Sequence, residues 1–84
     1  MRLAFDQSAW DDIQWWVIHD RQTVHRIFKL VDATLRDPRA GIGKPEPLRG
    51  LGGEVWSRRI TLEHRLVYTI EDDLIIIESC RHHY

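Results

Sequence analysis

The sequence is poor in cysteine and in long apolar runs, and each scarcity excludes a class of protein. Its one cysteine, Cys80, cannot form an internal disulfide, which is typical of a protein in a reducing compartment. Apolar runs such as residues 74–77 have the length of a strand, far below the roughly 20 residues that span a membrane. Residues 1–10 also lack the apolar stretch of a signal peptide. We therefore expect a cytoplasmic protein.

The sequence also has almost no excess charge, and a formal net charge of -1 argues against a protein that binds polyanions over its whole surface. The positive charges are nevertheless concentrated in the middle of the chain. Residues 36–70 hold seven cations against four acids: Arg36, Arg39, Lys44, Arg49, Arg58, Arg59 and Arg65. A local cationic patch can hold phosphate groups even when the total charge is near zero.

The 84 residues are enough for one domain, spanning residues 1–84, with a small core. Hydrophobic residues make up 43% of the chain and include four tryptophans, which argues against disorder.

Two helices are predicted after a short strand at residues 2–5. Ser8 has the features of an N-cap, and the residues that follow it place four apolar side chains on one face: Trp10, Ile13, Trp16 and Val17. Asp20 is the expected N-cap of a second helix, whose apolar residues recur at helical spacing: Val24, Ile27, Phe28, Val31 and Leu35. Asp37-Pro38 ends it, because a residue before proline resists the helical conformation.

Residues 38–53 contain all three prolines and all five glycines, and are predicted to form a long loop. After this loop the apolar pattern changes to period two, which predicts a meander of three strands at 54–60, 63–70 and 74–81. The order of elements predicts an α+β fold in which the two N-terminal helices pack on one face of an antiparallel sheet.

The register of this sheet can be predicted from its alternation. Leu66, Tyr68 and Ile70 share one face, and Trp56 on the preceding strand best matches that face. The same register places Arg59 with Arg65 on the opposite face. We expect helices on one side of the sheet and guanidinium groups on the other.

Glu46 lies in the segment Lys44-Pro45-Glu46-Pro47, where both Lys44 and Glu46 precede a proline and are expected to be extended. Stiff backbone on both sides would present the carboxylate in a fixed place, as a general base requires. The alternative is a solvated carboxylate in a turn, which is the commoner fate of a surface acid.

The sequence ends in Cys80-Arg81-His82-His83-Tyr84. A strand is predicted to run almost to the last residue, and histidine can exchange a proton near neutral pH. The alternative is a pair of strand-end histidines with an aromatic residue covering the edge of the core.

Arg59 and Arg65, with Lys44 and Arg49 in the adjacent loop, would form an anion site, because a guanidinium matches phosphate oxygens. The alternative is a solvated face in which these arginines pair with Glu54 and Glu63. A carboxylate, an imidazole and clustered guanidiniums are together the groups that RNA cleavage by 2'-OH attack needs. This chemistry needs no cofactor and no metal, and the sequence offers no cysteine pair or helical histidine pair to bind one.

Four segments carry a resemblance to a known family. In order, they are Gly43-Lys44-Pro45-Glu46-Pro47-Leu48, Trp56-Ser57-Arg58-Arg59-Ile60, Glu63-His64-Arg65-Leu66-Val67-Tyr68 and Cys80-Arg81-His82-His83-Tyr84. With Ser8, Trp10, Asp11 and Asp12 near the start, they resemble the YoeB toxins, which belong to the RelE/ParE toxin superfamily. The sequence departs from the expected pattern in three places: Arg49 stands where lysine is usual, residues 50–55 are richer in glycine and carry an acid before Trp56, and His82 replaces an aromatic residue.

The resemblance implies a microbial-ribonuclease-like, RelE-like fold and cleavage of mRNA in the A site of the 70S ribosome. It implies that Glu46 is the general base, that His83 is the general acid, that Arg65 stabilises the transition state and that Tyr84 contacts the scissile nucleotide. Lys44, Arg49 and Arg59 would hold the RNA backbone. The implied partners are a YefM-type antitoxin and a second copy of the chain. The alternatives are a non-catalytic RNA- or protein-binding module on the same fold and, less favoured, a metal-dependent hydrolase.

Overall fold

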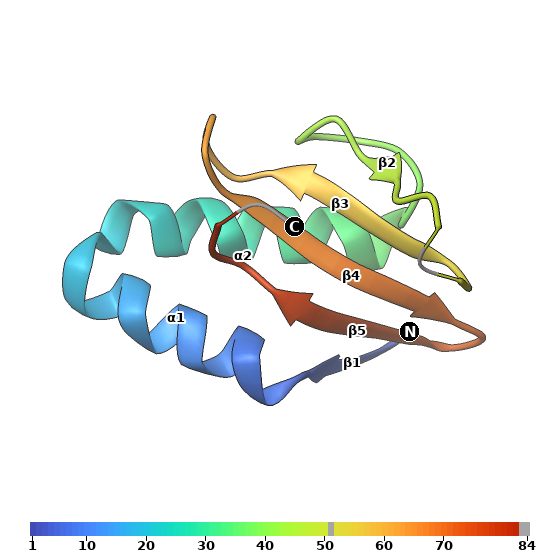
Figure 1. Cartoon of the computed structure of the whole chain (residues 1–84), viewed down its shortest axis with the longest axis horizontal. Helices are drawn as coiled ribbons and strands as arrows, with labels where there is room; N and C mark the ends of the chain where they lie inside the picture. The colour runs from blue at the N-terminus through green and yellow to red at the C-terminus, as the bar shows by residue number, and fades with distance from the viewer. Residues whose placement is uncertain (51, 83–84) are drawn as a thin grey trace.

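The protein is described here by a computed structural model that covers residues 1–50 and 52–82. The elements are β1 (Arg2–Phe5), α1 (Gln7–His19), α2 (Arg21–Arg36), β2 (Glu46–Pro47), β3 (Val55–Arg59), β4 (Arg65–Glu71) and β5 (Leu74–Ser79). They form a five-stranded sheet in the order β1-β5-β4-β3-β2, with both helices on one face (Figure 1). The predicted α+β fold is confirmed. The edge strand β1 pairs in parallel with β5 and makes the sheet mixed.

Both helices begin at an aspartate. The predicted cap of α2 is confirmed, since the carboxylate of Asp20 accepts hydrogen bonds from the backbone N–H and the hydroxyl of Thr23. The predicted cap of α1 was wrong, because Asp6 rather than Ser8 occupies that position. The Asp6 carboxylate accepts from Ser8 N at 3.1 Å and from Ser8 Oγ at 2.6 Å, and these bonds lower the pKa of Asp6. The Ser8 hydroxyl also lies 3.1 Å from the Glu78 carbonyl, so it ties the start of α1 to the end of the sheet.

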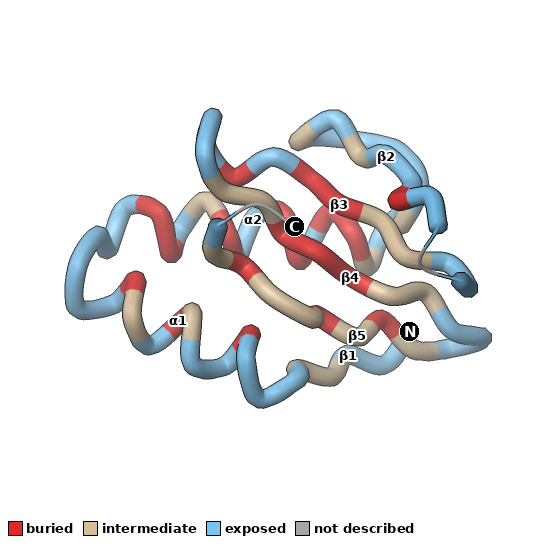
Figure 2. Tube along the Cα trace, viewed as in Figure 1, coloured by how far each residue is buried: buried red, intermediate tan, exposed pale blue. Residues whose placement is uncertain are grey.

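The core lies between the helices and the sheet, and Figure 2 shows its buried residues along β4 and on the facing sides of the helices. Its members include Ala9, Ile13 and Trp16 of α1, Val24, Ile27, Leu30 and Val31 of α2, and Leu66, Tyr68, Ile75 and Ile77 of the strands. Trp10, Val17 and Phe28 were predicted to face the core but are exposed. In α1 the fully buried position is Ala9 rather than Trp10, and the Ala9 carbonyl accepts a hydrogen bond from Cys80 Sγ.

The predicted register of the sheet is confirmed, with Trp56 opposite Tyr68 and Arg59 opposite Arg65. This register places Arg58 opposite Leu66 on the helix side, where the arginine is completely buried. Arg58 therefore does not belong to a solvent-facing cationic patch. Within the described residues, no helix combines the length and the apolar character that crossing a membrane requires.

The buried Arg58 holds the loop that follows α2. Its guanidinium donates hydrogen bonds to the carbonyls of Asp37, Ala40 and Ile42 at 2.6, 2.9 and 2.8 Å. Its Nε donates to the hydroxyl of Tyr68, and that hydroxyl donates to the carbonyl of Pro38 at 2.6 Å. Burial raises the pKa of Tyr68, so its hydroxyl remains a donor at neutral pH. Together these bonds fasten residues 37–42 to the centre of the sheet.

We predict that Arg58→Met lowers the free energy of unfolding by about 2 kcal/mol or more, because it removes all the hydrogen bonds of a buried guanidinium, and a hydrogen bond to a charged group contributes about 1.5–3 kcal/mol. The exposed neighbour provides the control, and Arg59→Met should change stability by less than about 0.5 kcal/mol. Urea unfolding followed by tryptophan fluorescence measures both. Equal stability of the two variants would contradict the role given to Arg58.

Candidate active site

Three adjacent strands bring the candidate residues to the sheet face that points away from the helices. Glu46 of β2 pairs with Ser57 of β3, and Ser57 pairs with Val67 of β4. Directly paired residues point to the same side of a sheet, and Arg65 lies two positions from Val67 on β4. Glu46, Ser57 and Arg65 therefore gather on one face, although 8 to 19 positions separate them in the chain.

The carboxylate of Glu46 and the guanidinium of Arg65 form an ion pair, with 3.0 Å between Oε1 and Nη1. The same Arg65 Nη1 donates to the hydroxyl of Ser57, also at 3.0 Å. The Arg65 side chain is only 15% exposed, whereas that of Glu46 is 51% exposed. A largely enclosed, hydrogen-bonded guanidinium thus orients a carboxylate that remains open to solvent, an arrangement suited to proton transfer beside an anion.

The segment that carries Glu46 differs from the prediction in two ways. Residues 46 and 47 form the short strand β2 within the predicted loop, and Leu48 N extends the pairing by donating to the Val55 carbonyl at 2.8 Å. Lys44 was predicted to be extended but has a φ of 50°. The cause is a tertiary bond: Arg59 N donates to the Gly43 carbonyl at 2.7 Å, so the chain must turn at residues 43 and 44 before it enters β2.

Gly43 is required at this turn. It has a φ of 84°, and a Cβ atom there would lie 2.7 Å from Leu30 Cδ2 and 3.0 Å from Arg58 Cβ. Only glycine lets the loop approach α2 and β3 this closely without displacing them.

The predicted RNA-binding cations are exposed, and one of them lies on this face. Lys44, Arg49 and Arg59 are all exposed, and Arg59 stands opposite Arg65 in the sheet. Sequence analysis missed Arg26 of α2, whose Nη2 donates to the Arg59 carbonyl at 3.2 Å and adds a further positive charge. Arg26 and Arg59 are 33 positions apart and lie on a helix and a strand, so no local sequence pattern indicates that they are close. The contact is seen only in the folded structure.

The alternative interpretation, in which Arg59 and Arg65 pair with Glu54 and Glu63 on a solvated face, does not describe the ion pairs seen in the described part of the chain. Glu54 pairs with Arg39 at 2.7 Å and also accepts from Trp56 Nε1 at 2.9 Å. The hydrogen bond from Arg39 is the main reason that the pKa of Glu54 is lowered. The carboxylate that meets Arg65 is that of Glu46, the predicted general base.

His83 and Tyr84 lie outside the described residues, but the chain that leads to them is anchored close to Arg65. Strand β5 ends at Ser79, two residues before the predicted end, and helix α1 then takes over as the partner of the chain. Asp12 accepts a hydrogen bond from Cys80 N at 2.9 Å, and Trp16 Nε1 donates to the Cys80 carbonyl at 2.8 Å. Arg65 N donates to the His82 carbonyl at 3.2 Å, which brings the end of the described chain to the candidate site.

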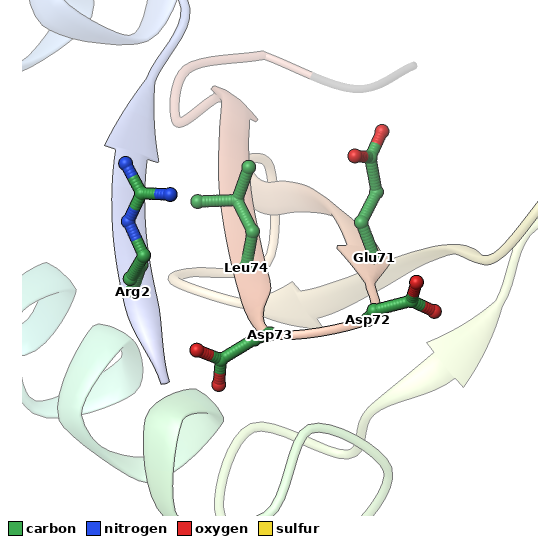
Figure 3. Close-up of a pocket in the computed structure, with 5 residues that line it drawn as sticks. All are labelled: Arg2, Glu71, Asp72, Asp73 and Leu74. Carbon is green, nitrogen blue, oxygen red and sulfur yellow. The ribbon is translucent and has the colours of Figure 1, made fainter.

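A second feature of the surface is separate from this site. A hollow lined by Arg2, Glu71, Asp72, Asp73 and Leu74 lies at the turn between β4 and β5 (Figure 3). This turn is at the opposite end of β4 from Arg65, about 20 Å away at the usual rise of a strand. Its three carboxylates would repel a phosphate. Within residues 1–50 and 52–82, no group of three or more histidine, cysteine, aspartate or glutamate side chains is gathered as a metal site would require.

Comparison with known proteins places this geometry in a family. A model of the YoeB-like toxins of bacterial type II toxin-antitoxin systems matches residues 5–84. The toxin YoeB of Synechocystis sp. is 50% identical over 84 residues, which cover 100% of this chain and 98% of that protein. The toxin YoeB of Escherichia coli strain K12 is 46% identical over the full length of both chains.

Solved structures agree with the sequence relatives. The YoeB/ParE toxin from Agrobacterium tumefaciens superimposes with a TM-score of 0.94 at 44% identity, covering 100% of both chains. A YoeB dimer from Staphylococcus aureus gives 0.91 at 39% identity, and a heterotetrameric YoeB-YefM complex from the same organism gives 0.88 at 41% identity. Each of these two matches covers 100% of this chain and 98% of the other. The chain belongs to the YoeB family of toxins of bacterial type II toxin-antitoxin systems.

Proposed function

We propose that this toxin is a ribosome-dependent endoribonuclease that cleaves mRNA in the ribosomal A site and so stops translation. The observation that carries the proposal is the 3.0 Å pair between Glu46 and Arg65 on the sheet face that points away from the helices. The exposed Arg59 lies opposite Arg65 in the sheet, and His82 is hydrogen-bonded to the backbone of Arg65. This arrangement combines a proton acceptor with an anion-binding group.

The proposed reaction is an attack of the ribose 2'-OH on the neighbouring phosphate. Glu46 removes the 2'-OH proton as the oxygen attacks, and Arg65 holds the negative charge that develops on the phosphate oxygens. His83 donates a proton to the leaving 5' oxygen, so the products are a 2',3'-cyclic phosphate and a 5'-hydroxyl end. Positioned proton transfer contributes about 10²–10⁴-fold to such a reaction. Stabilisation of the developing charge is usually the larger effect.

Substrate entry rearranges the ion pair in this proposal. A phosphodiester that reaches Arg65 competes with Glu46 for the guanidinium, because both are oxyanions that match its donors. The carboxylate is then released toward the 2'-OH. Tyr84 orients the scissile nucleotide, while Lys44, Arg49 and Arg59 hold the flanking RNA backbone.

The proposed partners follow from the relatives. A Staphylococcus aureus YoeB forms a complex with YefM, and a YoeB from the same organism is described as a dimer. We propose that this chain likewise binds a YefM-type antitoxin and forms a homodimer. The ribosome and its mRNA are the proposed targets.

The catalytic assignments predict that Glu46→Ala, Arg65→Ala and His83→Ala each slow cleavage by about 10²-fold or more, the range that loss of a proton-transfer or charge-stabilising group produces. Mapping of mRNA ends in a reconstituted translation reaction measures the rate. Glu63→Ala is the matched control, because Glu63 is an exposed acid of the β3–β4 turn outside the proposed machinery. Binding to the ribosome without cleavage by the unaltered toxin would favour a non-catalytic binding module instead.

A second prediction concerns the end of the chain. Deletion of Tyr84, or addition of several residues after it, should reduce cleavage by about 10-fold or more, because misplacement of a reacting group by about 1 Å can cost 10²-fold. The same residues added before Met1 should leave the rate unchanged, since Met1 pairs with Asp73 at the far end of β4. Full activity with a C-terminal extension would count against a catalytic chain end.

A third prediction applies in cells. Expression of the toxin should arrest growth, and co-expression of the YefM-type antitoxin should restore it. The Glu46→Ala protein should be harmless at the same expression level because the base is missing. Growth arrest by Glu46→Ala equal to that by the unaltered toxin would show that toxicity does not arise from the proposed cleavage.

A further inference from the structure

The residue that precedes His83 has an unusual backbone. His82 has a φ of 67°, and it is one of two non-glycine residues with a positive φ among those that the structure describes. A left-handed conformation costs a non-glycine residue roughly 1–2 kcal/mol, so it persists only where the surroundings hold it. Such strained residues tend to gather at functional sites.

Two consecutive residues hold His82 by both of its backbone polar groups. Its N–H donates to Nδ1 of His64 at 2.7 Å, and its carbonyl accepts from the N–H of Arg65 at 3.2 Å. We call this pair of bonds the His82 clamp. The clamp involves Arg65, the proposed charge-stabilising residue, and its neighbour His64. On the other side it involves His82, which immediately precedes the proposed acid, His83.

His64 is itself held through both its ring and its backbone. Its ring packs edge to face against Trp16, with 4.8 Å between the ring centroids. Its backbone N–H donates to the hydroxyl of Thr61 at 3.1 Å. Since Nδ1 accepts a hydrogen bond from an amide, this nitrogen carries no proton in the clamped form. His64 thus provides a fixed acceptor for the backbone N–H of His82.

The other contacts of the C-terminal segment, residues 80–82, are made by Cys80 and Arg81 and do not hold the backbone of His82. Asp12 and Trp16 hold Cys80, and the guanidinium of Arg81 lies 3.7 Å from the ring centre of Trp15. These contacts fix the tail against α1 but lie one or two residues upstream. Among the described residues, the hydrogen bonds of His82 are those with His64 and Arg65.

From these contacts we infer that His64 is a positioning residue for the proposed cleavage, which acts through the His82 clamp by fixing the backbone of the residue that precedes the proposed acid, His83. The inference rests on the proposed function, because it assigns His64 a part in that same cleavage. His64 does not touch the substrate in this scheme. Its contribution is the fixed placement of a group that must reach the leaving oxygen.

The test compares His64→Asn, His64→Gln and His64→Ala. The asparagine oxygen can occupy the place of Nδ1 and accept from His82 N, whereas the glutamine oxygen reaches the place of the other ring nitrogen. We expect His64→Asn to retain activity within about 3-fold and His64→Gln and His64→Ala to lose about 10-fold or more in kcat, with KM nearly unchanged. His25→Ala, which alters an exposed histidine on α2, is the control.

This set separates the hydrogen bond from ring packing. Asparagine lacks the ring that packs against Trp16, so a role in packing alone would impair His64→Asn as much as His64→Ala. That outcome would overturn the inference, and so would equal activity of the asparagine and glutamine variants. The comparison of these two remains decisive even if His64→Ala fails to fold.

A measurement that needs no activity tests the clamp independently. The amide of His82 should exchange slowly with solvent in the unaltered toxin and in His64→Asn, and rapidly in His64→Gln, because only the first two provide an acceptor. NMR hydrogen exchange reports this directly. Absence of cleavage by the unaltered toxin would refute the proposed function, whereas normal cleavage by His64→Gln would refute the inference alone.

Discussion

The pairing of β3 with β4 is the constraint on which the rest of this structure depends. Because side chains alternate along a strand, the register that sets Arg59 opposite Arg65 also sets Arg58 opposite Leu66. A slip of one residue would expose Arg58 and drive Arg59 into the core. The alternation thus assigns two adjacent arginines to different tasks: Arg58 supports the fold from inside, and Arg59 faces the solvent beside the candidate active site.

The placement of Glu46 follows from that buried arginine. Arg58 fastens residues 37–42, and the Gly43 carbonyl is then fixed by Arg59 N, so the loop meets the sheet with little freedom just before Glu46. Pairing of Glu46 with Ser57 completes the approach. A carboxylate from a glycine- and proline-rich loop thereby becomes as well placed as one on a regular strand, which is what acid–base chemistry demands.

Helix α1 has a similar role for the other end of the chain. The tail leaves the sheet after Ser79, and its next residue is bound by Asp12 and Trp16, which also contributes to the core. Trp16 therefore both packs in the core and holds the C-terminal segment. Burial raises the pKa of Cys80 to about 12, which keeps the thiol neutral where the chain leaves β5 and meets α1. Residues 80–82, which follow the last strand and would otherwise be prone to fray, are therefore held against α1 and β4.

The sequence by itself determined the features that repeat locally: the α+β order, the period-two register, the Asp20 cap and the segments that identify the family. Only the tertiary structure decided which stripe of α1 is buried, how Lys44 turns, and that Glu46 meets Arg65. The physical reason is range. Periodicity and capping are written in neighbouring residues, whereas the bonds from Arg59 N to Gly43 and from Trp16 to Cys80 join distant segments whose meeting leaves no local pattern.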